Sequence, residues 1–195
     1  MRRISNKKEM YSEVMKWYEE GDDENVLCLN PEYTELPELP TNVKHLSLEK
    51  SNIEVIDSLP PCLESLVATN SKLSEIKTLP RTLRVLNIGN TNIKNLPLLP
   101  ETLEILVISN CGFYYMPKIF HTKLRILFCG YNLFEVMPEI PDSLETLDCV
   151  GCKNLSTFVR IPATIHTFHT DFTEFEFQIQ ENLEDLSVSM FSLKI

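Results

Sequence analysis

The chain has 195 residues, a formal net charge of -10 and a hydrophobic fraction of 43%. Such an acidic chain is poorly suited to the phosphate backbone of nucleic acids or to an anionic membrane surface, because both require clustered lysine and arginine. No run approaches the about 20 apolar residues of a bilayer-spanning helix, and the charged start lacks an apolar signal core. We therefore expect a cytoplasmic protein that binds neither nucleic acid nor membrane.

The first predicted element is an amphipathic helix over residues 6–20. Asn6 and Glu9 have the spacing of a helix capping box, and Gly21 follows as a stop signal. The apolar residues of this segment recur on one helical face: Met10, Val14, Trp17 and Tyr18. We expect this helix to cover the first coil of the repeats that follow.

An apolar pair of the form Leu-x-x-Leu dominates the rest of the chain. It recurs at intervals of 20, 20, 20, 21, 20, 21 and 18 residues. The pairs are Val43/Leu46, Leu63/Leu66, Leu83/Leu86, Leu103/Leu106, Leu124/Leu127, Leu144/Leu147, Ile165/Phe168 and Leu183/Leu186. This period is typical of stacked leucine-rich repeat coils. We predict a helical cap with a degenerate strand near residue 27 in 1–30, and a solenoid of about eight coils in 31–195, forming a single domain.

One coil, residues 83–93, illustrates the predicted alternation. Leu83, Leu86 and Ile88 point into the core, while Val85 and Asn87 point outward from a short strand that stacks in parallel on its neighbours. A polar or cysteine slot follows eight residues after each first leucine. It is occupied by Ser51, Ser71, Thr91, Cys111, Asn132, Cys152 and Thr173, whose side chains we expect to bond the turn backbone.

The return path of each coil is rich in apolar-proline dipeptides such as Leu96-Pro97 and Leu99-Pro100. Proline fixes its own φ and biases the preceding residue to extended geometry, so this side cannot be helical. The predicted fold is thus an α/β repeat: a short-period leucine-rich repeat solenoid with a parallel concave β-sheet, a polyproline-like convex side and an N-terminal capping helix.

Charges of alternating sign occur one residue after each first leucine. They are Lys44, Glu64, Arg84, Glu104, Arg125, Glu145, His166 and Glu184. Because adjacent strands lie about 4.8 Å apart, opposite charges on neighbours attract and favour in-register stacking. We interpret this ladder as a device for register and solubility.

The six cysteines predict a reduced protein without disulfides. Cys129 and Cys149 fall in inward core slots, and Cys111 and Cys152 fall in the polar slot, so four of the six have a repeat role. The Cys149-x-x-Cys152 spacing could form half of a zinc site, but its two thiols occupy different slots and no second pair accompanies them. We expect neither metal nor cofactor.

The unit Leu-Pro-x-Leu-Pro-x-x-Leu-x-x-Leu, seen at residues 36–46 and preceded by the segment with Trp17, resembles the repeats of bacterial type III secreted effectors of the YopM and IpaH class. The matching residues run from about Met10 to Pro162. This resemblance implies a protein-binding concave face that acts inside a host cell. Ligase members of the class carry a catalytic domain after the repeats. We expect a chain without that domain.

The outward strand positions of the middle coils are unusually apolar. The predicted partner-binding residues are Val67, Val85, Asn87, Ile105, Val107, Ile126, Phe128 and Tyr131. Exposed apolar patches commonly mark partner sites, with aromatic side chains as anchors. The alternative is that β-branched residues simply suit strands and remain bare.

Asp148, His169 and Ser187 share one outward slot on successive strands and superficially resemble a catalytic relay. A smooth sheet face offers no pocket or oxyanion donors for catalysis. Strand alternation points His166 and His169 in different directions, which argues against a metal site formed by this pair. We therefore predict a non-catalytic module that binds a protein partner, most simply as a monomeric adaptor. The alternative is a structural component of a larger assembly, for example a viral one, joined through its carboxyl-terminal edge.

Overall fold

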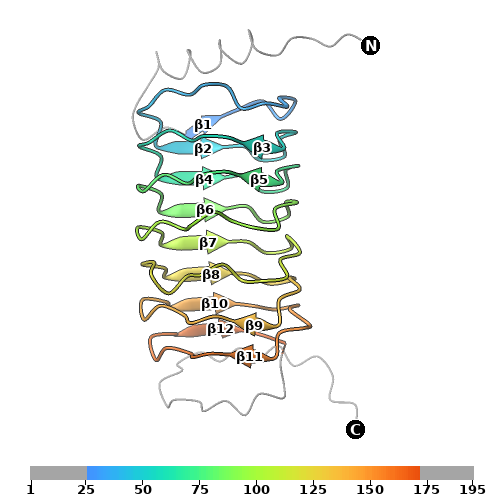
Figure 1. The fold of residues 1–195 in the computed structure, drawn as a ribbon, viewed down its shortest axis with the longest axis vertical. Coiled ribbons are helices and arrows are strands. Elements are labelled where there is room, and N and C mark those ends of the chain that lie inside the picture. The colour runs from blue at the N-terminus through green and yellow to red at the C-terminus, as the bar shows by residue number, and fades with distance from the viewer. Residues whose placement is uncertain (1–25, 172–195) are drawn as a thin grey trace.

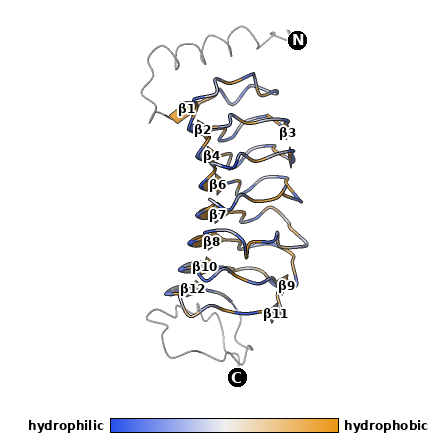
Figure 2. Ribbon diagram, turned by 60° about the vertical axis from the view of Figure 1, so that its left-hand side comes forward, coloured by the Kyte–Doolittle hydropathy of each residue, from blue (hydrophilic) through white to orange (hydrophobic). Residues whose placement is uncertain are grey.

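The computed structural model describes residues 26–171, which form a stack of coils along one eight-stranded parallel sheet (Figure 1). The sheet contains strands β1 (Val26–Cys28), β2 (His45–Ser47), β4 (Ser65–Val67), β6 (Val85–Asn87), β7 (Ile105–Val107), β8 (Ile126–Phe128), β10 (Thr146–Asp148) and β12 (Thr167–His169). Figure 2 shows these strands in one column and the return paths on the other side of the stack.

The strand register follows the sequence period. Leu46 pairs with Leu66, Leu66 with Leu86 and Leu86 with Leu106, and the same slot continues to Phe168 in β12. Seven of the predicted coils and the degenerate opening strand are thus confirmed. The eighth pair, Leu183/Leu186, lies outside the described residues.

No helix occurs within residues 26–171, where the chain forms strands and turns. The helical part of the predicted α/β class depends on residues 6–20. That predicted capping helix lies outside the described residues.

The core is a continuous apolar column between the sheet and the return paths. Leu83, Leu86 and Ile88 are fully buried, as predicted from the alternation within the coil. The return path adds a second inward pair in each coil, such as Ile53 and Ile56. Because every coil packs against the next, burial is shared along the stack and no single compact centre exists.

The convex side differs from the predicted polyproline-like path in four coils. Strands β3 (Val55–Ile56) and β5 (Glu75–Ile76) pair with each other, as do β9 (Val136–Met137) and β11 (Thr157–Phe158). The expectation of a uniformly polyproline-like side was therefore wrong for these coils, while the absence of helix within them is confirmed.

Proline explains where this convex ladder stops. The amide of Lys77 donates to the Ile56 carbonyl at 3.0 Å, and the amide of Val159 donates to the Met137 carbonyl at 3.2 Å. The equivalent positions in the coils between them are Pro97, Pro117 and Pro138. Since proline has no amide hydrogen, it cannot donate to the preceding coil, and the ladder is interrupted there.

In the six coils where the structure describes it, the slot eight residues after the first leucine is buried and hydrogen-bonds the backbone of its own turn or of the preceding coil. Thr173 lies outside the described residues. Ser71 Oγ donates to the Ala68 carbonyl at 2.7 Å, and Thr91 Oγ1 donates to the Ile88 carbonyl at 2.8 Å. The Cys111 thiol donates to the Ile88 carbonyl at 3.1 Å. The two hydroxyls thus bond the carbonyl of their own turn, whereas the Cys111 thiol bonds that of the preceding coil.

Candidate protein-binding face

The outward side chains of the eight-stranded sheet lie in two rows, because each three-residue strand buries its middle residue and turns the other two away from the core. One row contains Ser65, Val85, Ile105, Ile126 and Thr146, and the other contains Val67, Asn87, Val107, Phe128 and Asp148. We call this surface the sheet face.

Five of the predicted binding residues are brought together on β6, β7 and β8. We call them the apolar strip: Val85, Ile105, Ile126, Val107 and Phe128. Phe128 is 37% exposed, and the other four are half-buried on the outward side. The predicted outward orientation of these side chains is confirmed.

Val67 is set apart from the rest of its row. Asn87 lies between Val67 and Val107, and its Oδ1 accepts a hydrogen bond from the Gly89 amide at 3.3 Å. Val67 can reach the strip only along the diagonal to Val85 on the next strand. The apolar surface is therefore shorter along the stack than the predicted patch.

Tyr131 occupies a strained turn position beside the strip. Its φ is 57°, in the left-handed region that is uncommon for non-glycine residues, and its side chain is 63% exposed. A Cβ atom added at Gly151 would lie 2.5 Å from Tyr131 Cδ1, so the tyrosine ring covers the glycine of the next coil. Tyr131 thus extends the strip at its edge, and its ring can lie there because Gly151 has no side chain.

Asparagines fill the same left-handed position in the three preceding coils, and Lys50 fills it in the coil before those. Asn110 Nδ2 donates to Asn90 Oδ1 at 2.8 Å, and Asn90 Nδ2 donates to Asn70 Oδ1 at 3.1 Å. We call this row the asparagine ladder. Our sequence reasoning did not consider it, although asparagine at an interval of 20 residues was a visible signal.

The predicted charge ladder borders the other edge of the strip. Arg84 binds Glu104 through two hydrogen bonds of 2.9 and 3.2 Å, and Arg125 binds Glu145 through two of 2.9 Å. Hydrogen bonding to Arg125 lowers the pKa of Glu145 and, reciprocally, raises the pKa of the guanidinium. These pairs are exposed and satisfied within the molecule.

Two members of the hypothetical relay meet on the sheet face. His169 Nδ1 lies 3.5 Å from Asp148 Oδ2, and Asp148 Oδ1 accepts a hydrogen bond from the Val150 amide at 3.1 Å. Ser187 lies outside the described residues. An acid and an imidazole on an open surface form an ion pair when the imidazole is protonated, which accounts for this arrangement without catalysis.

All six cysteines are free thiols, and four of them are buried. Burial raises the pKa of Cys149 to about 12 and that of Cys152 to about 11. Their thiols face different backbone carbonyls, Cys149 that of His169 at 3.6 Å and Cys152 that of Cys129 at 3.2 Å. These are protonated core thiols of low reactivity. Nowhere in residues 26–171 do three histidine, cysteine or acidic side chains gather as metal ligands would.

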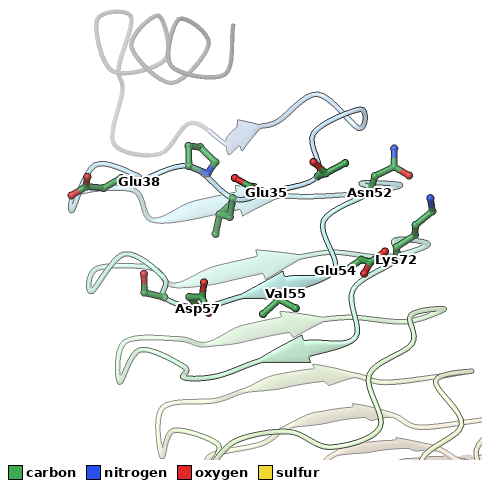
Figure 3. Close-up of a pocket in the computed structure, with 11 residues that line it drawn as sticks. Glu35, Glu38, Asn52, Glu54, Val55, Asp57 and Lys72 are labelled. Carbon is green, nitrogen blue, oxygen red and sulfur yellow. The ribbon is translucent and has the colours of Figure 1, made fainter. Parts of the chain in front are cut away.

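A second surface feature, absent from our sequence predictions, is an open hollow on the return paths of the first two coils (Figure 3). Residues 34–38 form one wall, residues 52–58 form the other, and Lys72 lies at the rim. The charged lining is mainly acidic, with Glu35, Glu38, Glu54 and Asp57. Asp57 is already paired, since its Oδ1 lies 2.5 Å from Lys77 Nζ.

No protein-family model matches the chain, and no curated protein sequence matches it. Among solved structures, the chain is similar to YopM, a leucine-rich effector protein from Yersinia pestis, with 18% identity and a TM-score of 0.60. The match covers 85% of this chain and 65% of that one, so the chain spans just under two thirds of the length of YopM.

The chain is also similar to the leucine-rich repeat domain of a Shigella effector, with 21% identity and a TM-score of 0.63. This match covers 87% of the chain and 78% of that domain. At such identities the similarity establishes the fold, and it confirms the predicted resemblance to effector-type leucine-rich repeats. Among the described residues, none belongs to a helix with the length and apolar character to cross a bilayer.

Proposed function

We propose that this protein is a non-catalytic interaction module that binds a partner protein through its sheet face. The observation that supports this is the apolar strip, which places Val107 and Phe128 side by side on a surface open to solvent. Apolar patches of this kind are commonly covered by partners, and aromatic residues often supply the anchor. The similarity to two effector repeat domains favours the same class of function.

In this proposal the protein works as an effector-like adaptor in the cytoplasm of a host cell. The acidic chain disfavours nucleic acid and anionic lipid as partners, because it lacks the clustered cations that they require. The same proposal includes two structural features, a concave sheet face and an amino-terminal helix over residues 6–20. The helix would cover the outer edge of β1 and keep the module monomeric.

The decisive variant is Phe128→Asp. Phe128 points outward and is 37% exposed, so a carboxylate there should remain solvated while repelling an apolar partner surface. Tyr115→Asp is the matched control, because Tyr115 is 83% exposed on the return path, away from the sheet face. Circular dichroism and thermal unfolding would establish that both variants fold as the wild type does.

Affinity capture from host-cell lysate, quantified by mass spectrometry, would then compare the three proteins. We expect the partner to be retained by the wild type and by Tyr115→Asp, and depleted at least about tenfold with Phe128→Asp, since an anchor residue contributes on the order of 2 kcal/mol. Equal capture by Phe128→Asp would refute the sheet face as the binding site.

A further inference from the structure

The apolar strip has no free hydrogen-bond donors or acceptors for the backbone of a partner. Strands β6, β7 and β8 are interior strands with a neighbour on both sides, so their backbone groups are used within the sheet. For example, the Ile88 amide donates to the Val107 carbonyl at 2.9 Å, and the Ile108 amide donates to the Phe128 carbonyl at 2.8 Å. The side chains of the strip are all hydrocarbon. A partner segment that lies on it must therefore satisfy its own backbone hydrogen bonds.

An extended peptide does not meet this requirement, because its amides and carbonyls on the strip would be buried without partners. An α-helix does, since its backbone hydrogen bonds are internal. A sheet also satisfies its backbone, but it presents a broad face, whereas the strip is two side chains wide.

The dimensions of the strip match a single helix. Val85, Ile105 and Ile126 lie on three successive strands, which spans about 10 Å at about 4.8 Å per strand. Residues i and i+7 of a helix are also about 10 Å apart, at 1.5 Å rise per residue. A helix that lies along the stack would therefore place apolar residues i, i+4 and i+7 over β6, β7 and β8.

The borders of the strip suit the polar flanks of such a helix. Ile88, Ile108 and Cys129 directly follow the three strands and are buried. The next residues are Gly89, Ser109 and Gly130, so only small side chains separate the strip from the asparagine ladder and Tyr131. On the other edge, the Arg84–Glu104 and Arg125–Glu145 pairs present charges of both signs. Amide and ionic groups on both sides can meet polar helix residues without burying an unpaired charge.

Charge complementarity favours a basic polar face on the partner. The chain carries a net charge of -10, and the carboxylates of Asp148 and Asp171 lie in the coils that follow the strip. Opposite charge on the partner would speed association and align the segment along the stack.

We propose that the partner segment is a cationic amphipathic α-helix that lies lengthwise across β6, β7 and β8, with its apolar residues i, i+4 and i+7 on the strip. This inference rests on the proposed function, because it specifies the kind of segment that the same surface binds. Helices that lay an apolar face on a complementary surface are a recurrent mode of recognition.

The test is a selection from an unbiased random-peptide display library against the full chain, with Phe128→Asp as the counter-selection protein and Tyr115→Asp as the control. We expect the enriched peptides to share apolar residues at i, i+4 and i+7 together with lysine and arginine elsewhere. Synthetic copies should gain helical circular dichroism on binding and should shift the methyl signals of Ile105 and Ile126.

A proline placed at the centre of an enriched peptide should weaken its binding about a hundredfold, because proline breaks the helix interior. Moving that proline to the first helical turn should leave the affinity nearly unchanged, since proline is tolerated there.

The outcomes separate this inference from the proposed function. Peptides that depend on Phe128 but show an alternating pattern, or that tolerate the central proline, would overturn the helix and leave the sheet face as a binding site. A selection that yields no peptide dependent on Phe128 would count against the binding face itself.

Discussion

Asn132 shows how a single side chain can close a coil. Its Nδ2 donates to the carbonyls of Cys129 at 2.8 Å and Ile108 at 2.9 Å, while its Oδ1 accepts from the amide of Phe113 at 3.0 Å. Thr91 in the same slot donates to one backbone carbonyl, that of Ile88, and its Oγ1 lies 3.5 Å from Cys111 Sγ of the next coil. The amide therefore bonds the backbone of two coils, whereas the hydroxyl bonds the backbone of its own turn alone.

We predict that Asn132→Ala is more destabilising than Thr91→Ala. Removing the buried amide leaves several backbone groups without partners, which should lower the free energy of unfolding by about 3 kcal/mol, against about 1 kcal/mol for the single backbone bond of Thr91. Urea denaturation followed by circular dichroism measures both. Equal losses of stability for the two variants would show that the bonds of Asn132 to the preceding coil do not add to stability.

The conformation of Tyr131 could not be predicted from the sequence. The sequence placed it at the strand exit, next to the strip. Its φ of 57° and its position over Gly151 depend on the coil that follows, since the ring lies where a side chain at residue 151 would stand. Sequence spacing identifies the neighbour but not the rotamer.

At the scale of the elements, the charge ladder works in pairs. The predicted alternation of sign is present, and two of its steps are bidentate ion pairs between adjacent coils, Arg84 with Glu104 and Arg125 with Glu145. An arginine fork can engage one carboxylate through two parallel hydrogen bonds, and it then points toward that partner.

We predict that Arg125→Gln raises the pKa of Glu145 toward its ordinary value of 4.5. The pKa of Glu145 is lowered in the folded protein, so its contribution to stability is present above the unfolded pKa and is lost as the pH falls through the folded pKa. Acidification below pH 4.5 should therefore weaken the wild type more than Arg125→Gln. NMR titration of the Glu145 carboxyl measures the shift.

Arg84→Gln is the control for this titration, because Arg84 pairs with Glu104 and should leave the pKa of Glu145 nearly unchanged. An unchanged pKa of Glu145 in Arg125→Gln would contradict the assignment of the shift to that hydrogen bond.

Prolines decide which return paths on the convex side form short strands. The prolines correctly excluded helix from the described return paths, but they did not make the side uniform. Short strands form at two places where the donor position holds a residue with an amide hydrogen, Lys77 and Val159. This rule could have been applied to the sequence once the coils were aligned.

For the whole molecule, stability is distributed along the stack, since each coil contacts only its neighbours. Leu106 lies at the middle of β7, fully buried between Leu86 and Leu127. A defect at this point should weaken two interfaces between coils and divide the solenoid into two halves.

We predict that Leu106→Ala lowers the free energy of unfolding by about 3 kcal/mol, because it leaves a cavity in the core. Hydrogen exchange should show reduced protection in β6, β7 and β8 before the ends of the described stack. Leu98→Ala, at a side chain that is 80% exposed, should change stability by no more than about 0.5 kcal/mol. A uniform loss of protection in every coil would instead indicate one cooperative unit.

The sequence by itself determined the period, the seven described coils, the inward slots and the outward orientation of the strip. It could do so because a repeat of about 20 residues places equivalent positions side by side, and alternation along a strand decides which of them face the core. These features depend on local geometry that is the same in every coil.

Only the tertiary structure decided how neighbouring side chains use that proximity. It separated Val67 from the strip by Asn87, joined the asparagines into a ladder, placed Tyr131 over Gly151 and opened the acidic hollow between the first two coils. These features depend on rotamers and on the backbone path of the adjacent coil, and both are set by packing between coils, which the spacing of residues along the chain does not specify.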